Sequence, residues 1–194
     1  TVTGIDDDKK FEVTVTAASG EKTYNGQDQT VEGLSNTEFK WNDQKYTITG
    51  LEAKVTGKDA GTYTNEVRGT AVIKDASGND VTDQFKLNTV NGQLTINPRK
   101  VTLTSASDSK DYDGTALVNP NVTADGFVDG EGAVYSVTGT ITLPGTADNE
   151  FIYVLNDGTN AKNYEITPVY GKLTINDRKE EDKEADKVTV AAES

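Results

Sequence analysis

The segment DQFKLNTVNGQLTIN at residues 83–97 returns later in the chain as KNYEITPVYGKLTIN at residues 162–176. Both copies end in QLTIN or KLTIN, where apolar and polar residues alternate as in a strand with one buried face. Four earlier segments also recur in the same order: FEVTVT (11–16) with KVTLT (100–104), YNG (24–26) with YDG (112–114), YTITG (46–50) with YSVTG (135–139), and GTYTNEV (61–67) with GTADNEF (145–151). The chain therefore contains one module twice.

The apolar pattern predicts an all-β protein, because alternation with a period of two prevails and no convincing helical period occurs in either repeat. The size of each repeat suits a sandwich, so we expect two tandem antiparallel β-sandwich (Ig-like) modules. The alternative is a β-grasp-like module with a crossover helix, in which residues 81–85 form a helical turn. Asn91-Gly92 lies between two alternating runs and predicts a two-residue hairpin turn.

The repeats divide the chain into four parts. They are residues 1–10, the end of a preceding repeat and a linker; 11–97, the first β repeat; 98–177, the second; and 178–194, a charged linker and the first strand of a further repeat. Because both ends resemble the interior of the pattern, we expect the chain to be a piece of a longer array. Between the repeats, Pro98 restricts Asn97 to extended conformations, which predicts a short and stiff joint.

Composition argues against several classes of function. The 194 residues include 32 acidic and 19 basic ones, giving a net charge of −13, which would repel nucleic acid and anionic membranes. No apolar run reaches the roughly 20 residues that a membrane span needs. Cys, His and Met are all absent, which removes thiol chemistry and the commonest general base. We expect neither an enzyme nor a required cofactor, and we expect a monomer.

The corner motif reads YNG at residues 24–26 and YDG at residues 112–114. Since one copy has Asn where the other has Asp, we expect no charge-dependent role at this place. A tyrosine here can bury its ring, and the glycine can take the left-handed conformation of a turn. Stacking on a sugar ring is the alternative role of the tyrosines. We predict structural corners at Tyr24, Gly26, Tyr112 and Gly114.

Two kinds of ligand site remain open. Acidic loops can hold calcium through several oxygens, although none here follows the spacing of a known calcium loop. The calcium candidates are Asp6, Asp7 and Asp8, then Asp75, Asn79 and Asp80, then Asp125, Asp129 and Glu131. Exposed aromatic residues can contact a glycan or a host protein, and the candidates are Trp41, Tyr46 and Tyr63. Trp41 lies in FKWNDQKY, which we expect to form a hairpin tip.

A covalent staple is a further hypothesis for a surface protein without disulfides. A buried acid can assist the attack of a lysine amine on an asparagine amide, which forms an isopeptide bond. Both repeats hold such residue types at matched places: Lys22, Glu66 and Asn97 in the first, and Lys110, Glu150 and Asn176 in the second. The chemistry requires burial of the lysine, because burial lowers the pKa of its amine.

The corner motif, the G-T-x-x-N-E segment and the terminal G-x-L-T-I strand occur together and in this order. With these motifs, residues 11–176 resemble the MBG/YDG-type repeats of bacterial surface proteins, some of which are associated with mucin-binding proteins. The resemblance implies tandem extracellular β modules in large secreted or cell-wall-attached adhesins, without catalytic residues. Asn25 and the longer middle of the first repeat depart from that pattern.

From the repeats and this resemblance we expect structural stalk repeats that project a binding region from the bacterial cell wall. Their partners are then the neighbouring repeats of the same chain. The alternative is that the repeats themselves bind mucin glycans or a host protein. We expect neither a nucleic-acid partner nor insertion into a membrane.

Overall fold

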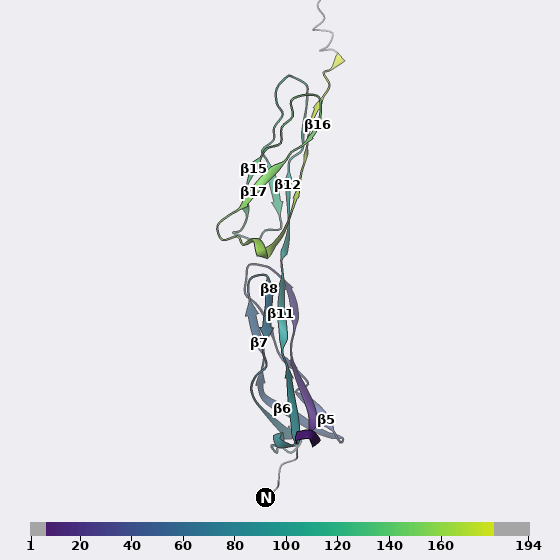
Figure 1. Cartoon of the computed structure of the whole chain (residues 1–194), viewed down its shortest axis with the longest axis vertical. Helices are drawn as coiled ribbons and strands as arrows, with labels where there is room; N and C mark the ends of the chain where they lie inside the picture. Colours follow the sequence, from purple (N-terminus) through teal and green to yellow (C-terminus); the bar gives the residue numbers. More distant parts are fainter. Residues whose placement is uncertain (1–6, 181–194) are drawn as a thin grey trace, which may run out of the picture. The chain divides into compact units, whose positions relative to one another are not determined.

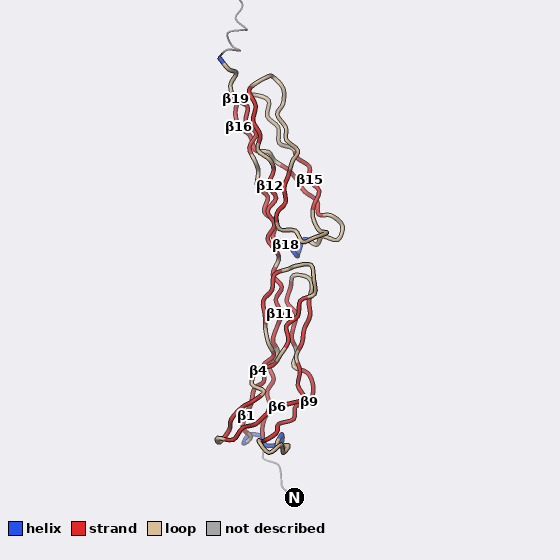
Figure 2. Tube along the Cα trace, turned by 180° about the vertical axis from the view of Figure 1, so that it is seen from behind, coloured by secondary structure: helices blue, strands red, loops and turns tan. Residues whose placement is uncertain are grey.

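The computed structural model describes residues 7–180, which divide into a first unit ending at Pro98 and a second unit beginning at Arg99 (Figure 1). The predicted end of a preceding repeat falls partly at residues 1–6, and the first strand of a further repeat falls at residues 181–194. Those segments lie outside the described residues. Apart from short helical turns, both units consist of strands and loops (Figure 2), so the all-β prediction is confirmed. No helix within residues 7–180 is long and apolar enough to cross a membrane.

The strands follow the alternating patterns of the sequence. Those of the first unit are β1 (Phe11–Ala17), β2 (Gly20–Thr23), β3 (Gln29–Glu32), β4 (Leu34–Ser35), β5 (Glu38–Trp41), β6 (Gln44–Glu52), β7 (Lys54–Gly57), β8 (Gly61–Asn65), β9 (Arg68–Asp75), β10 (Phe85–Val90) and β11 (Gly92–Asn97). Those of the second unit are β12 (Arg99–Ser105), β13 (Asp108–Asp111), β14 (Val122–Asp125), β15 (Ala133–Val137), β16 (Gly145–Asp148), β17 (Phe151–Leu155), β18 (Tyr164–Val169) and β19 (Lys172–Asn176). Short 3-10 turns lie at Asp7–Lys9, Thr82–Gln84 and Ala161–Asn163.

The two units share one topology of small sheets. In the first unit the strand orders are β10-β1-β4, β2-β11-β8, β3-β7 and β5-β6-β9. In the second unit they are β14-β12-β18, β13-β19-β16 and β15-β17. Burial alternates along β1 and β12, where Val15 and Leu103 are fully buried, and along β11 and β19, where Leu94 and Leu173 are. The strands that open and close each repeat thus supply much of its core.

Two strand pairs in each unit are parallel, which departs from the expected antiparallel sandwich. β1 pairs with β10 and β2 with β11, and β12 pairs with β18 and β13 with β19. Parallel neighbours need a long crossover connection, which the whole middle of each repeat supplies. The helical turn expected in the β-grasp alternative is present as the 3-10 turn Thr82–Gln84, but no crossover helix occurs within residues 7–180.

The hairpin predicted at Asn91-Gly92 is wrong, because β10 and β11 do not pair with each other. β10 pairs with β1, whereas β11 pairs with β2 and β8, so Asn91 lies where the chain passes from one sheet to the next. Gly92 is required at this crossing, since a Cβ there would lie 2.6 Å from the carbonyl oxygen of Ala17. At the matching Gly171, a Cβ would lie 2.5 Å from the carbonyl oxygens of Ser105 and Ala106.

The sheets differ at two places. The β3-β7 pair of the first unit has no counterpart sheet among the described residues of the second, where Leu117 and Ile141 form only an isolated bridge. In the first unit β5 pairs antiparallel with β6, through a tight turn whose central residues Asn42 and Asp43 have φ of 48° and 60°. Such angles are those of a two-residue hairpin, so the hairpin tip predicted beside Trp41 is confirmed. In the second unit β15 pairs with β17 alone, and the residues before β15, 126–132, form a loop instead of a strand.

Candidate functional site

The corner motif lies directly after β2 and β13, at the end of the parallel strand pair. The backbone amides of Tyr24 and Tyr112 donate to the carbonyl oxygens of Asn97 and Asn176, at 2.9 and 3.0 Å. Tyr24 is 2% exposed and belongs to the core of the first unit. The corner therefore ties the end of the second strand of each repeat to the end of its last strand.

The middle residue of the corner has one role in both units. The Oδ1 atom of Asn25 accepts from the backbone amide of Gln27, and that of Asp113 accepts from Thr115, both at 2.9 Å. An amide and a carboxylate can close this local turn equally well, because each offers an acceptor oxygen. The following glycines, at 26 and 114, have φ of 77° and 79°, which is the left-handed conformation expected for them.

In the second unit the middle residue of the corner also forms an ion pair, which the uncharged Asn25 of the first unit cannot form. Asp113 also accepts from the Thr115 hydroxyl at 2.7 Å and from the Lys110 ammonium at 2.9 Å. Hydrogen bonds from Thr115 and then Lys110 hold the pKa of Asp113 far below its usual range. The carboxylate is exposed, and surface ion pairs of this kind add little stability. The turn common to both units remains the main role of this position.

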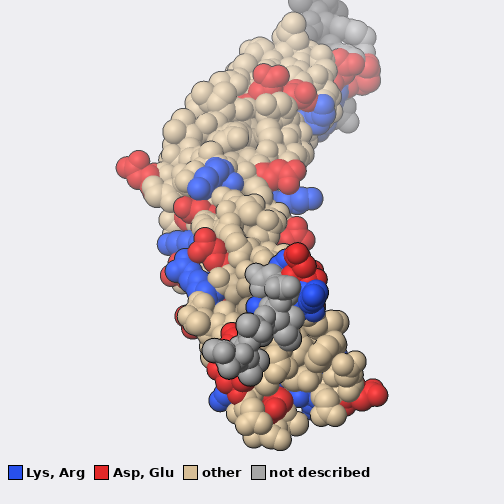
Figure 3. Space-filling model, turned by 60° about the horizontal axis from the view of Figure 1, so that its bottom comes forward, with Lys and Arg blue, Asp and Glu red and all other residues tan. Residues whose placement is uncertain are grey.

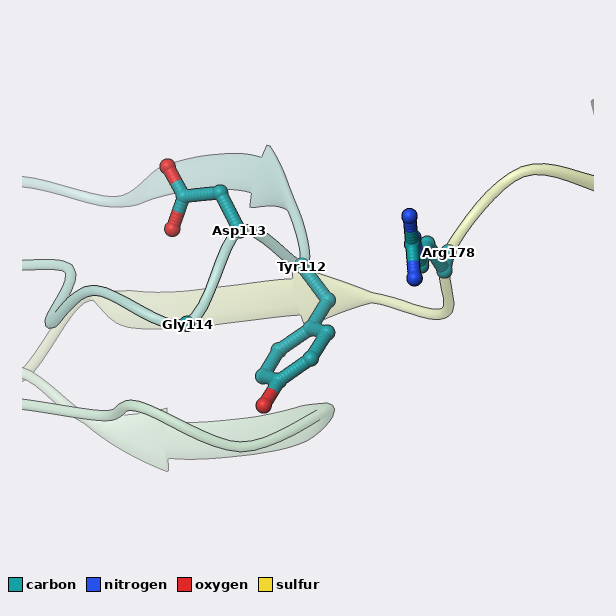
Figure 4. A pocket seen from close by; sticks show the side chains of 4 residues that line it. All are labelled: Tyr112, Asp113, Gly114 and Arg178. Carbon is teal, nitrogen blue, oxygen red and sulfur yellow. The ribbon is translucent and has the colours of Figure 1, made fainter. Parts of the chain in front are cut away.

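A pocket of about 510 Å³ opens beside this corner, lined by Tyr112, Asp113, Gly114 and Arg178 (Figure 4). The ring of Tyr112 and the carboxylate of Asp113 point to opposite sides of the backbone, and Arg178 follows β19 (Figure 4). Because Asp113 already accepts three hydrogen bonds and its pKa is lowered, it is a poor general base near neutral pH. Among the described lining residues, Asp113 and Arg178 offer this pocket polar contacts.

The aromatic candidates lie mostly inside the first unit. Tyr46 is 8% exposed, and its ring packs 4.9 Å from that of Phe85. Trp41 is half-buried, with its ring 5.5 Å from Phe85 and 5.8 Å from Phe11. Tyr63 is also half-buried and donates its hydroxyl to the backbone oxygen of Asp59 at 2.9 Å. Tyr46 therefore contributes to the core rather than to a glycan-contacting surface, and Trp41 seals the edge of that core.

The calcium candidates at the end of β9 and in the loop after it accept hydrogen bonds from neighbouring residues of that loop. Asp75 accepts from the backbone amides of Ser77 and Asn79, and Asp80 accepts from the amide and hydroxyl of Thr82. Hydrogen bonds from the backbone and side chain of Asn79 lower the pKa of Asp75, and those from Thr82 lower the pKa of Asp80. Both carboxylates thus stabilise the turn of their own loop.

The remaining calcium candidates form two groups, one at residues 6–8 and one at residues 125–131. Asp6 lies outside the described residues, and Asp7 and Asp8 lie in the first 3-10 turn. Asp125 ends β14, Asp129 lies in the loop before β15, and Glu131 accepts from the Tyr164 hydroxyl at 2.5 Å. Within the described part of the chain, no three acidic side chains come close enough together to hold a metal ion.

The isopeptide candidates of the first unit do not form a buried group. Lys22 is exposed on β2, and Glu66 forms an ion pair with Arg68 at 2.8 Å. The Asn97 side chain is exposed and donates its amide to Glu21 at 3.3 Å. The group therefore lacks the buried lysine that the attack on an amide requires.

The matched residues of the second unit also do not come together, although Lys110 is half-buried. Lys110 donates to the corner residue Asp113, and the Asn176 amide donates to Asp111 at 3.3 Å. Glu150 has an exposed side chain beside β17. These contacts are not the buried lysine, acid and asparagine that isopeptide chemistry needs.

Sequence reasoning missed the most buried polar residues, Asn65 and Asn149, which are both 0% exposed. Asn65 ends β8 and Asn149 directly follows β16, and each donates its side-chain amide to the crossing between the first two strands of its unit. Asn65 donates to the oxygen of Ala18, and Asn149 to those of Ala106 and Asn119, all at 2.9 Å. The signal was present, because the same asparagine stands in both copies of the segment.

In comparisons with protein-family models, curated proteins and solved structures, no match to this chain was found. On the face shown in Figure 3, Lys and Arg side chains are scattered among Asp and Glu side chains rather than gathered into a patch of one sign.

Proposed function

We propose that the two units are stalk modules of a bacterial surface adhesin, placed outside the cell and attached to the cell wall, that project a binding region and carry tension. The observation that supports this most is the parallel pairing of the opening and closing strands in each unit. β1 and β10 pair over six residues, from Phe11 with Phe85 to Thr16 with Val90. β2 and β11 pair over a further four.

This pairing determines how a pulling force acts on the module. Since the paired strands are parallel, the chain enters a unit at one end of the pair and leaves at the other. Tension through the chain then slides the strands along each other and loads their evenly spaced hydrogen bonds together. Antiparallel neighbours pulled from one end would lose their bonds one at a time. The geometry suits a module that must resist force.

Two features of the chain favour the same role. Residues 11–23 run through β1 and β2 in one direction, which covers roughly 40 Å at about 3.3 Å per residue. Only Pro98, whose φ is restricted by its ring, separates β11 from β12. The first repeat is thus connected to the second by a single residue.

The alternative function, binding of mucin glycans or a host protein by these repeats, finds less support at the residues proposed for it. Tyr46 is buried, and Trp41 packs against the same cluster. A panel of immobilised mucins and glycans separates the two functions. We expect the chain not to bind the panel, whereas binding that Trp41→Ala abolishes would support the alternative.

Single-molecule pulling tests the stalk proposal directly. The chain has no cysteine, so two introduced cysteines define the points of attachment. Attachment at Glu12→Cys and Asn97→Cys loads the strands in shear, whereas Glu12→Cys and Asp83→Cys peel β1 from β10 starting at one end. We expect a clearly higher unfolding force for the first pair of sites.

The second unit provides a matched repetition, with Lys100→Cys and Asn176→Cys for shear and Lys100→Cys and Lys162→Cys for peeling. Equal forces in the two directions would remove the mechanical argument. The proposed location is tested separately, since an antibody against this chain should label intact cells of the source bacterium and lose its signal after surface proteolysis.

A further inference from the structure

The outer face of the β15–β17 ribbon carries an unusual group of exposed aliphatic side chains. Val134, Ile152 and Val154 are 61%, 64% and 66% exposed, and a shallow groove of about 100 Å³ lies over them. Val134 pairs with Val154 across the ribbon, so these side chains form one contiguous surface. Contiguous exposed apolar surfaces of this kind mark interaction sites.

The ribbon also has an open edge. At one end of the ribbon the backbone amide of Thr138 donates to the oxygen of Glu150, and at the other end the amide of Asn156 donates to the oxygen of Gly132. These two bonds show which residues of β15 bond to β17. In an antiparallel pair this role alternates, so the even-numbered residues of β15 bond to β17. The backbone groups of Ala133, Tyr135 and Val137 therefore point to the other edge, where no strand pairs within the described residues.

The first unit shows what occupies this edge when it is filled. There β5 pairs with β6, and Phe39 lies opposite Tyr46 with the rings stacked 5.3 Å apart. By the repeat alignment, β6 corresponds to β15 and Tyr46 to Tyr135. A short antiparallel strand with aromatic residues at alternate positions is thus the natural complement of this edge.

The outer face of the β5-β6-β9 sheet carries lysines at places where the β15–β17 ribbon carries aliphatic residues. By the strand registers, Lys45 of the first unit stands where the second has Val134, and Lys74 stands where it has Ile152. Lysines protect strands against pairing with other chains. The unit that already has its third strand carries these lysines, and the unit that lacks the strand carries aliphatic residues.

Area and charge favour a foreign segment over a second copy of the chain. A stable dimer needs roughly 800 Å² from each partner, far more than a few aliphatic side chains provide. An added strand instead gains most of its affinity from backbone hydrogen bonds. Carboxylates lie at both ends of the ribbon, with Glu131 and Asp157 at one end and Glu150 at the other, and the chain carries a net charge of −13. Basic residues on the partner are therefore favoured.

We propose that the open edge of β15 binds an extended segment of another protein, in which aliphatic or aromatic residues alternate with polar ones and Lys or Arg flanks the segment. The segment adds antiparallel to β15, as β5 does to β6. Its backbone bonds to Ala133, Tyr135 and Val137. Its apolar side chains lie on the side of Tyr135, as Phe39 lies opposite Tyr46, and the polar residues between them lie beside Val134 and Ile152. This interaction is independent of the stalk role.

The test uses the full chain and two probes. One is a fluorescent peptide with the sequence of residues 35–41, SNTEFKW, and a lysine at each end, and the other is a displayed library of short peptides. We expect saturable binding of the peptide and selection of alternating basic sequences. Hydrogen exchange should slow at the amides of Ala133, Tyr135 and Val137, whereas Val134 and Ser136 already bond to β17 and should change little.

The first unit supplies the control variants. Val134→Lys with Ile152→Lys copies its lysines and should fold normally, while binding should weaken at least tenfold because the new lysines repel the basic segment. Lys45→Val with Lys74→Ile places aliphatic residues beside a filled edge and should gain no binding. Failure of both probes to bind, or binding unchanged by the first double variant, overturns the proposal. A dimer in sedimentation that the double variant abolishes would also overturn it, because the occupant would be a second copy.

Discussion

Replacement of Asn149 by alanine tests whether one buried side chain holds the strand crossing of the second unit. The Asn149 side chain is fully buried and donates to the carbonyl oxygens of Ala106 and Asn119. Its backbone amide donates to the oxygen of Gly171, and its backbone oxygen accepts from Ser105. One residue thus connects several segments that lie far apart in the sequence.

The structure sets the expected cost. Asn149→Ala removes two hydrogen bonds worth about 1 kcal/mol each and leaves two carbonyl oxygens without their donor, which adds a similar penalty. We therefore expect the free energy of unfolding of the second unit to fall by about 2–4 kcal/mol. Asn65 makes only one such bond, to Ala18, so Asn65→Ala should cost the first unit about 1–2 kcal/mol.

Urea denaturation can follow the two units separately. The single tryptophan, Trp41, reports on the first unit by fluorescence, whereas far-ultraviolet circular dichroism reports on both. With an m-value of about 1 kcal/mol per M, Asn149→Ala should lower the midpoint of the second unit by about 2 M or more. The fluorescence transition should stay in place in that variant and shift only in Asn65→Ala.

The chemistry of the side chain allows a sharper variant. Asn149→Asp keeps the shape but replaces the donor group with a carboxylate that faces two carbonyl oxygens, so it should destabilise more than alanine does. The expected order of loss is Asn149→Asp, then Asn149→Ala, then Asn65→Ala. A loss below about 0.5 kcal/mol for Asn149→Ala, or a larger loss for Asn65→Ala, would refute the proposed role of these bonds.

Three further outcomes are expected. Gly171→Ala places a Cβ 2.5 Å from backbone oxygens and should cost about 1–3 kcal/mol in thermal unfolding, whereas Gly132→Ala, whose nearest contact would be 3.4 Å, should be tolerated. Because hydrogen bonds lower the pKa of Asp113, its contribution to stability is complete above the ordinary pKa of 3.8 and is lost as the pH falls below that value. A carbon NMR titration should show the lowered pKa of Asp113, and Lys110→Ala should raise that pKa. Trp41→Ala removes a half-buried ring from the aromatic cluster, and circular dichroism should show a loss of about 2 kcal/mol in the first unit.

Local features of the fold were predictable from the sequence because they depend on neighbouring residues. The alternation in QLTIN and KLTIN indicates which side chains are buried, and Leu94 and Leu173 are indeed fully buried. The hairpin beside Trp41 was also predictable, since Asn42 and Asp43 readily adopt the positive φ that its turn needs. The same local reasoning failed at Asn91-Gly92, where the glycine serves a close approach of backbones instead of a turn.

The sequence by itself determined that this protein is an all-β module repeated twice, because repetition and a period of two are properties of the chain alone. Only the tertiary structure decided which strands are neighbours, and therefore that the opening and closing strands are parallel. It also decided that Asn65 and Asn149 are buried at the strand crossings and that β15 has an open edge. Alternation specifies the buried face of a strand, whereas its partner and direction depend on contacts between residues far apart in the sequence.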